Sequence, residues 1–272
     1  MDSTQQILAN AYRDVLTGLP QHWIDRSRSH EAEYAKLSGL FLPGTSPAFY
    51  AAPQKILVVG RETRRWDVLK GDDEFESLET YICKAMATQQ DHLAKFILKP
   101  RDRGESFFNL LRDLADDHGT QGIAWANLFS FAWDKKSPMR WKPHFAKVLE
   151  ISEQLLKVQV RILQPDIIIF ANGTSSAKFR QGYFPHKGES SVCSELGDFC
   201  KQGIPLNQLW RFKLHQRIQC FRIQHPSSIS ASSRAARRFL LEHLRVGGMG
   251  ELTPARSPFG LAQVMDNVPK IA

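Results

Sequence analysis

Four short β-rich runs punctuate the chain, at residues 56–59, 123–126, 165–170 and 218–223. Each run is mostly apolar and stops at a polar loop. A short apolar run bounded by turn residues is typical of a strand that is buried on both faces of a parallel sheet. We therefore predict four strands, with a polar loop at the carboxyl end of each.

Around these runs, apolar residues recur at the three- and four-residue spacing of amphipathic helices. The pattern predicts helices over residues 4–18, 76–98, 105–117, 143–163 and 233–244, and a helix that starts near 174–179. Strands that alternate with helices are typical of a parallel sheet covered by helices on both faces. We expect an α/β fold with three α/β/α layers and a central four-stranded parallel sheet.

The pattern also divides the chain into three parts. Residues 1–52 are predicted to form an N-terminal helix and proline-rich wrapping loops. Residues 53–246 would form the α/β domain, and residues 247–272 a C-terminal tail.

Two details of this division are less regular. Segment 180–215 is rich in Gly, Ser, Cys and charge, and is predicted to be an insertion or a hairpin. The last helix is predicted to be capped by Ser232 or Ser233 and to end at Gly247 and Gly248.

The chain of 272 residues has 36 Lys and Arg against 28 Asp and Glu, a formal net charge of +8. A basic chain suits a polyanionic partner such as DNA, although a modest positive charge is also common on soluble surfaces. Hydrophobic residues make up 42% of the chain, which is enough for a sizeable core.

The cysteines and the N-terminus narrow the class of protein. Cys83, Cys193, Cys200 and Cys220 show no C-x-x-C spacing and have no paired histidines, so no zinc site is predicted; an iron–sulfur cluster is the weaker alternative. The first residues do not resemble a signal peptide, and no apolar run approaches the length of a membrane span. We expect a cytoplasmic monomer without metal or cofactor.

Right-handed crossovers place the carboxyl ends of the four strands at one edge of the sheet. The polar residues that follow the strands are Glu62, Asn127, Asn172 or Gly173, and His225. A carboxylate can activate water or oppose a developing cation, an amide can read a nucleobase edge, and an imidazole can donate to an oxygen that gains negative charge. With a basic surface for phosphates, this set suits cleavage of an N-glycosidic bond in DNA.

Two loops carry a resemblance to a known family. Gly60-Arg-Glu-Thr63 follows the first strand, and His225-Pro-Ser227 follows the last. Over roughly residues 53–245 the chain resembles the uracil-DNA glycosylase superfamily, whose first motif is Gly-x-Asp-Pro or Gly-x-Asn-Pro and whose last is His-Pro-Ser before a wedge residue and a helix. The resemblance implies an α/β/α fold with a four-stranded parallel sheet.

The resemblance also implies roles for the matching residues. Glu62 stands where the family has its water-activating acid, one methylene longer than the usual Asp, and His225 matches the histidine that stabilises the leaving base. Asn127 takes the place of the base-reading asparagine, and Gly60 and Arg61 belong to the substrate pocket.

Contacts with DNA are expected from other positions. Ser227 would help to pinch the phosphate backbone, and Ile229 takes the wedge position, usually Leu, that fills the stack when a base is flipped out. Arg234 on the last helix, with Lys135 and Lys136 in a basic loop, would bind phosphates.

The chain departs from the family pattern beside the acid. Thr63 replaces the usual Pro, and Arg64-Arg65-Trp66 follows where a Tyr usually narrows the pocket. A wider or more polar pocket would admit a modified pyrimidine, including modified bases of phage DNA. The aromatic that stacks on the flipped base stays open among Phe75, Trp66, Phe129 and Trp133.

Each site residue also has an ordinary structural interpretation. Glu62 can be an acid at a helix N-terminus, Asn127 a turn residue, and His225 a partner of a backbone carbonyl. Ile229 can be part of the core, and the basic residues can be solvated faces.

We therefore predict a monofunctional DNA glycosylase that hydrolyses the bond between deoxyribose and a flipped-out uracil or modified pyrimidine, and leaves an abasic site. The alternative is a non-catalytic module of the same fold that binds DNA or a modified base, which Glu-Thr in place of Asp-Pro favours. A third class is an enzyme that acts on free nucleosides and has no salt-sensitive affinity for DNA.

Overall fold

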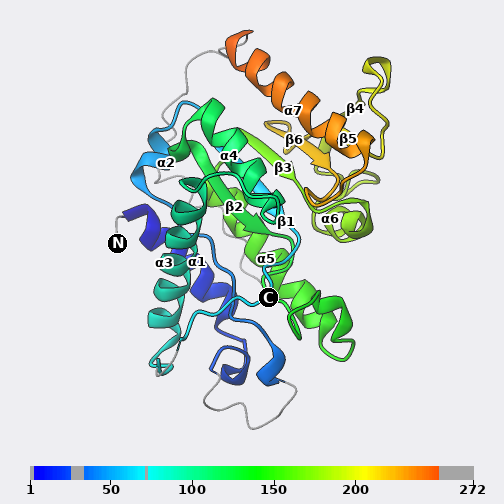
Figure 1. The fold of residues 1–272 in the computed structure, drawn as a ribbon. Coiled ribbons are helices and arrows are strands. Elements are labelled where there is room, and N and C mark those ends of the chain that lie inside the picture. The colour runs from blue at the N-terminus through cyan, green and yellow to red at the C-terminus, as the bar shows by residue number, and fades with distance from the viewer. Residues whose placement is uncertain (1–2, 26–33, 71–72, 251–272) are drawn as a thin grey trace.

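The computed structural model describes residues 3–25, 34–70 and 73–250, the last four of them as backbone. Its centre is a twisted six-stranded sheet (Figure 1). In spatial order the strands are β2 (Ile123–Asn127), β1 (Ile56–Gly60), β3 (Ile167–Phe170), β6 (Ile218–Ile223), β5 (Leu209–Leu214) and β4 (Cys193–Asp198).

The four strands expected from the sequence are present and parallel. β1 lies between β2 and β3, and β3 pairs with β6 on its other side. β1, β2 and β3 are buried along their whole length, which is why their sequences are apolar at consecutive positions rather than at alternate ones, with Asn127 at the end of β2 as the polar exception. The α/β class is therefore confirmed.

The expected count of four strands in a purely parallel sheet is wrong, because the sheet is mixed. β5 pairs antiparallel with β6, and β4 pairs antiparallel with β5. Both extra strands come from segment 180–215, which was expected to be an insertion or a hairpin. The segment does form a hairpin-like pair, but this pair extends the sheet.

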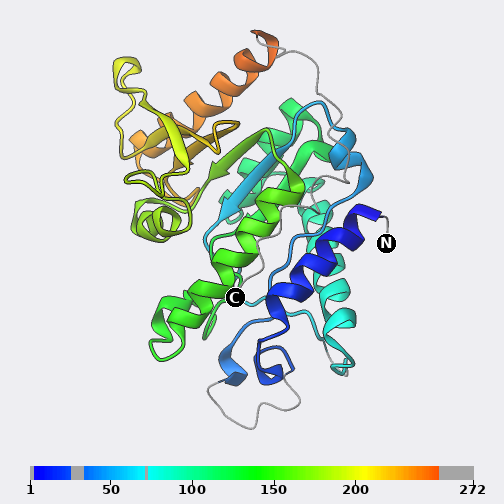
Figure 2. The same ribbon diagram turned by 180° about the vertical axis from the view of Figure 1, so that it is seen from behind.

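Helices cover both faces of the sheet (Figures 1 and 2). In Figure 1, α4 and α7 lie in front of the sheet, whereas Figure 2 shows α5 and α1 on the opposite side. The helices are α1 (Ser3–Leu16), α2 (Pro47–Ala51), α3 (Leu78–Ile97), α4 (Ser106–His118), α5 (Phe145–Leu163), α6 (Ala177–Tyr183) and α7 (Ala231–Gly250). No helix among the described residues is long and apolar enough to cross a membrane.

The last helix differs from its prediction at both ends. The Ser230 hydroxyl accepts from the backbone N–H of Ser233 at 3.1 Å, so Ser230, and not Ser232 or Ser233, caps α7. α7 continues through Gly247 and Gly248 to Gly250. Most of the predicted tail, 251–272, lies outside the described residues.

The N-terminal segment packs onto the same core as the sheet. α1 contacts α5 and α3, and the buried Tyr12 hydroxyl donates to the Pro43 carbonyl at 2.9 Å. Gln89 of α3 is fully buried, accepts from Gly44 N and donates to Trp125 O at the free edge of β2. The wrapping loops are therefore tied to the sheet by buried polar contacts.

Candidate active site

The carboxyl ends of β1, β2, β3 and β6 lie at one edge of the sheet. β1 and β6 are separated only by β3, so their loops are two strand spacings, or about 10 Å, apart. The first loop carries Glu62 and the second carries His225. The charges of Glu62 and Arg61 both act on the pKa of His225, which shows that the acid and the imidazole share one electrostatic environment.

The Glu62 carboxylate is held by two arginines. Arg61 donates from Nε to Oε2 at 2.7 Å and from Nη2 to Oε1 at 2.9 Å, and Arg64 Nε lies 3.4 Å from Oε1. The Glu62 side chain is 2% exposed, whereas those of Arg61 and Arg64 are 24% and 55% exposed. Both carboxylate oxygens are thus engaged in charge-assisted hydrogen bonds, which no sequence pattern indicates.

The His225 ring is fixed by its own loop. The backbone N–H of Ser227 donates to Nδ1 at 3.2 Å, and the Ser227 hydroxyl lies 2.7 Å from the same nitrogen. Burial is the largest cause of a lowered pKa, followed by the positive charge of Arg61. A neutral ring whose Nδ1 accepts carries its proton on Nε2, so Nε2–H is the group that can donate to a ligand.

Asn127 is buried, and two side chains orient its amide. Nδ2 donates to Thr63 Oγ1 at 2.7 Å, and Oδ1 accepts from Trp125 Nε1 at 3.2 Å. Gly60 makes this approach possible, because a Cβ at that position would lie 2.7 Å from Asn127 Oδ1. One N–H and one lone pair of the amide remain for a ligand. Thr63 and Trp125 are thus functional neighbours that the sequence did not identify.

Asn172 and Gly173, at the end of β3, lie between the two loops. Asn172 is 1% exposed, and neither atom of its side-chain amide has a hydrogen-bond partner within the described ranges. Gly173 adopts φ 75°, and a Cβ there would lie 3.4 Å from His225 N. The close approach and the positive φ both favour glycine and bring the β3 loop against the His225 loop.

The loop between β6 and α7 presents Ile229 to solvent. This side chain is 81% exposed, which excludes its interpretation as a core residue. Arg234 donates to the Ile229 carbonyl, and Arg237 donates to the Ser228 carbonyl at 3.1 Å. The arginines of α7 therefore hold the loop that carries Ile229.

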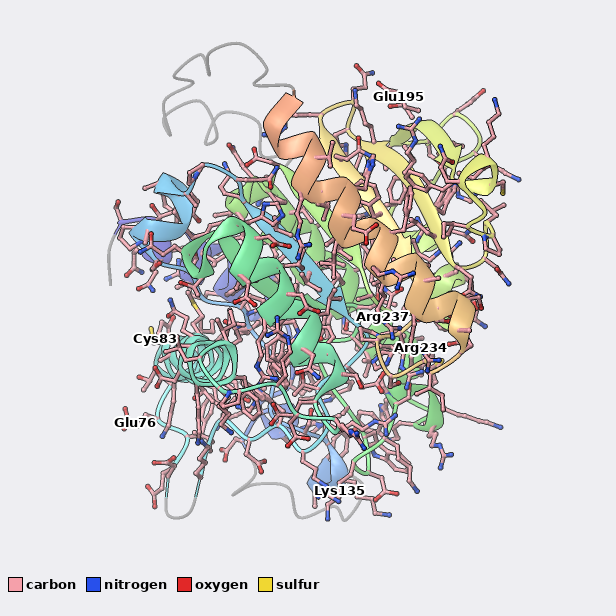
Figure 3. The ribbon with its side chains drawn as sticks, turned by 45° about the horizontal axis from the view of Figure 1, so that its top comes forward. Glu76, Cys83, Lys135, Glu195, Arg234 and Arg237 are labelled. Carbon is pink, nitrogen blue, oxygen red and sulfur yellow. The ribbon has the colours of Figure 1, made fainter. Side chains whose placement is uncertain are left out.

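The basic residues expected to bind DNA fall into two groups. Figure 3 shows Arg234 and Arg237 together and Lys135 well apart from them. Lys135 and Lys136 are exposed on a tight turn in which Asp134 and Lys135 adopt positive φ, and Trp133 pairs with Lys136 across that turn. A single phosphate cannot contact both groups.

The four aromatic candidates for base stacking do not fit that role well. Trp66 and Phe129 are buried at 4% and 0% exposure, and Trp133 and Phe75 are engaged with other rings.

Phe107 of α4 also packs on other rings, but it is set apart by its place next to Gly60. It is partly exposed, its ring lies 3.2 Å from where a Cβ of Gly60 would be, and it contacts the Trp125 ring at 5.5 Å. It therefore lies beside the Asn127 amide. Phe107 was not among the four aromatic candidates that the sequence offered.

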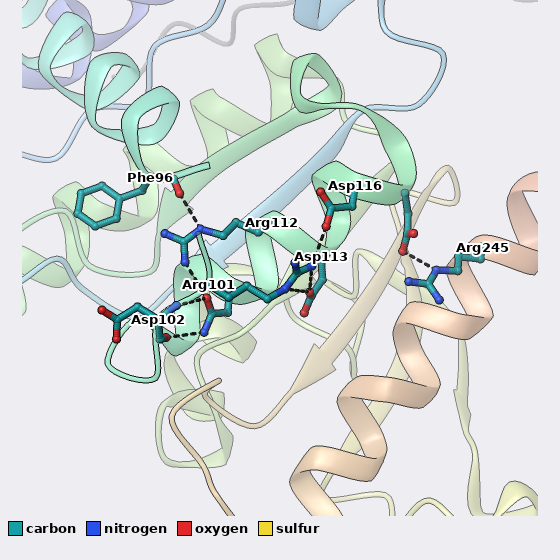
Figure 4. A network of polar contacts seen from close by, with 9 residues as sticks. Phe96, Arg101, Asp102, Arg112, Asp113, Asp116 and Arg245 are labelled. Atoms are coloured by element: carbon teal, nitrogen blue, oxygen red, sulfur yellow. Dashed lines mark hydrogen bonds and ion pairs between the residues drawn. The ribbon is translucent and has the colours of Figure 1, made fainter. Parts of the chain in front are cut away.

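A buried arginine, Arg112, ties the start of α4 to the connection that precedes it (Figure 4). α4 is the helix that carries Phe107. Arg112 is 3% exposed, pairs with Glu105, and donates to the Phe96 carbonyl at 2.8 Å and to Asn109 Oδ1 at 2.6 Å. These contacts tie the α3–α4 connection to the helix that faces the site.

A surface cavity of about 330 Å³ lies away from this edge, lined by residues 51–53 and 118–122 at the amino ends of β1 and β2. Its one ionisable side chain is His118, whose pKa is lowered by burial. Without a carboxylate in its lining, the cavity lacks an acid that could activate water. Within the described ranges, no three His, Cys, Asp or Glu side chains are grouped to hold a metal ion.

A scan against models of protein families and a search of curated proteins found no match to this chain. The geometry of the sheet edge therefore carries the functional assignment. The acid and two guanidinium groups come from the loop after β1, the oriented amide from the end of β2, and the imidazole, whose Nδ1 accepts a hydrogen bond, from the loop after β6.

Proposed function

We propose that this protein is a DNA glycosylase that hydrolyses the N-glycosidic bond of a flipped-out uracil or modified pyrimidine and leaves an abasic site. The observation that carries the proposal is the hydrogen bonding of the His225 ring together with the direction of its pKa. Its Nδ1 accepts from Ser227, its pKa is lowered, and Glu62 acts on it from the neighbouring loop. A neutral imidazole N–H and a carboxylate at one edge suit a bond whose two halves develop opposite charges.

The chemistry assigns one role to each group. The bond between C1′ and the base nitrogen breaks, its electron pair leaves with the base, and the sugar becomes oxocarbenium-like. The Glu62 carboxylate opposes that positive charge and takes a proton from the attacking water. His225 Nε2–H donates to the base oxygen that gains negative charge.

The loop after His225 supports the flipping of a base. An apolar side chain that is 81% exposed, Ile229, is held by hydrogen bonds from Arg234 and Arg237 to the loop carbonyls. A rigid apolar group of this kind can fill the stack that a flipped nucleotide leaves. In this proposal the chain acts as a cytoplasmic monomer on DNA, and modified pyrimidines of phage DNA are included among its substrates.

The test is base release from genomic DNAs of different modification state, read by mass spectrometry. Glu62→Gln and His225→Ala are each expected to lower the rate of release by at least about 100-fold while DNA binding persists. Arg238→Gln, an exposed position on the outside of α7, is the control and should retain the rate. Release at the original rate by the Glu62→Gln, His225→Ala double variant would exclude this site.

A non-catalytic module that binds DNA or a modified base is the second candidate. The observation in its favour is the coverage of Glu62 by Arg61 and Arg64. Labelled oligonucleotides with different bases, treated with alkali after incubation, separate the two functions. Binding without alkali-sensitive strand breaks would favour the module, and breaks at one base would favour the glycosylase.

A further inference from the structure

We propose that Arg61 is a phosphate-operated latch on Glu62. In the free protein it covers the carboxylate, and a phosphate of bound DNA draws the guanidinium away and uncovers the acid. The inference rests on the proposed function, because it takes Glu62 to be the acid of a reaction on DNA.

The structure holds Glu62 with both carboxylate oxygens bonded to Arg61 and with almost no exposed side-chain surface. A carboxylate takes a proton from water only when water reaches one of its oxygens. Arg61 occupies both oxygens at 2.7 and 2.9 Å, and the Glu62 side chain is 2% exposed. Catalysis by Glu62 therefore requires that this ion pair opens.

The Arg61 side chain is held in a way that permits such opening. Among the residues that the structure describes, the Arg61 side chain donates hydrogen bonds to Glu62 alone, and 24% of it is exposed. A phosphate presents the same pair of acceptor oxygens to a guanidinium as a carboxylate does, so the fork geometry is kept when the partner changes. The exchange replaces one ion pair by another.

The charge of this edge attracts the second partner. The positive charges of Arg61, Arg64 and Arg237 each lower the pKa of His225, and the negative charge of Glu62 raises it. The surplus of guanidinium groups raises the local concentration of anions. A phosphodiester next to the target nucleotide then meets Arg61 at the mouth of the site.

The latch defines a substrate class. Glu62 is uncovered only when a phosphodiester lies beside the target base, so the enzyme acts on nucleotides within a DNA strand. Free bases and nucleosides lack that group and leave Glu62 covered.

DNA binding tests the latch without knowledge of the target base. The affinity of the full-length protein for a short duplex of unmodified DNA is measured across a salt titration. Arg61→Gln should lower the slope of log K against log salt by about 0.9, the value for one phosphate contact. Glu62→Gln should tighten binding by about two- to fivefold, the strength of a partly exposed ion pair, because Arg61 is released to the phosphate. This gain should be absent when Arg61→Gln is already present.

Arg101 and Asp116 provide the matched controls. They form an ion pair at 2.6 Å on the α3–α4 connection and α4 (Figure 4). Arg101→Gln and Asp116→Asn remove the same charges, and neither should reproduce the effects at Arg61 and Glu62.

The outcomes separate the two proposals. Wild-type protein without salt-sensitive affinity for DNA would sink the proposed function. Salt-sensitive binding in which Arg61→Gln leaves the slope unchanged and Glu62→Gln behaves as Asp116→Asn would sink the latch alone, because Arg61 then stays on Glu62 in the complex.

Discussion

Thr63 links the Glu62 loop to Asn127. Its hydroxyl accepts from Asn127 Nδ2 at 2.7 Å, and Trp125 holds the other end of the same amide. The amide can therefore present only one of its two orientations. The family that the chain resembles usually has a proline at this position, and proline has no hydroxyl with which to accept this hydrogen bond.

Thr63→Val should lower base release by roughly tenfold to 100-fold, because a buried amide N–H that loses its partner costs about 1–3 kcal/mol and leaves Asn127 free to turn. Thr63→Ser, which keeps the hydroxyl, is the control and should retain most of the rate. Steady-state base release on the best substrate of the genomic panel measures both. Equal rates for the two variants would mean that base release does not depend on the orientation of the Asn127 amide by the Thr63 hydroxyl.

The pH dependence of the reaction should follow the protonation of a single residue, His225. Burial, and then nearby guanidinium groups, lower the pKa of His225 below its ordinary value of 6.5. Below pH 6.5 the unfolded chain therefore binds a proton that the folded protein does not, and this contribution to stability is lost as the pH falls. Protonation of Nδ1 in the folded state would also set two donors, the ring and Ser227 N–H, against each other.

We expect the wild-type rate of base release to persist as the pH is lowered through 6.5 and to fall only below it. Arg237→Gln removes one of the positive charges that lower the pKa of His225, so the acidic limb of the pH–rate profile should move to higher pH. Arg238→Gln, whose charge is not among those causes, should leave the limb in place. Coincident limbs for the three proteins would contradict the assignment of His225.

At the scale of elements, the parallel strands were predictable and the antiparallel pair was not. Strands buried on both faces have continuous apolar sequences, which are visible in a single chain. β5 instead alternates, with Trp210 and Phe212 on one face and Arg211 and Lys213 on the other, and that alternation was the available signal. The turn that joins it to β6 has no glycine: His215 and Gln216 adopt φ of 51° and 58° themselves, so the usual hairpin signal is missing.

Arg222 links this extra pair of strands to the site edge. It is 7% exposed and donates to the carbonyls of Asn207 at 2.6 Å and Leu206 at 2.7 Å, which fixes the loop before β5. Gln224, next to His225, donates to the same Asn207 carbonyl at 2.7 Å. The edge strands therefore support the His225 loop from the side.

Arg222→Met should lower the free energy of unfolding by about 2 kcal/mol, since two charge-assisted hydrogen bonds are lost while the buried volume is nearly kept. Arg211→Met is the matched control on β5, because Arg211 is exposed and its ring contact, with Phe199, is at 6.0 Å. Urea unfolding measures both. If the two variants lose equal stability, the hydrogen bonds from Arg222 to the carbonyls of Asn207 and Leu206 do not stabilise the fold as proposed.

At the scale of the whole molecule, the sheet topology explains why the sequence predicted where the site lies. It did not predict which partners its side chains have. The order of parallel strands places every carboxyl end at one edge, so Glu62 and His225 come together for any sequence with this fold. The partners of each side chain depend on loop geometry of a few tenths of an ångström. The Arg61 clamp and the Asn127–Thr63 contact therefore carried no sequence signal.

The two separate basic groups predict how DNA lies on the whole protein. Arg234 and Arg237 hold the loop after His225. Lys135, on the turn that it shares with Lys136, lies well apart from these two arginines, as Figure 3 shows. DNA that spans both groups must extend beyond the flipped nucleotide. Lys135→Gln with Lys136→Gln should lower the salt slope by about 1.8 on a long duplex, at about 0.9 per phosphate, and should have no effect on an oligonucleotide of a few nucleotides.

Lys157→Gln with Lys213→Gln is the control. Both lysines already pair with glutamates, and the double change gives the same net charge, 8 − 2 = +6. This control should leave the slope unchanged on both DNAs, since the charge of the whole protein is then equal and only its position differs. An equal loss of slope in the two double variants would mean that DNA senses net charge alone and does not reach the lysine turn.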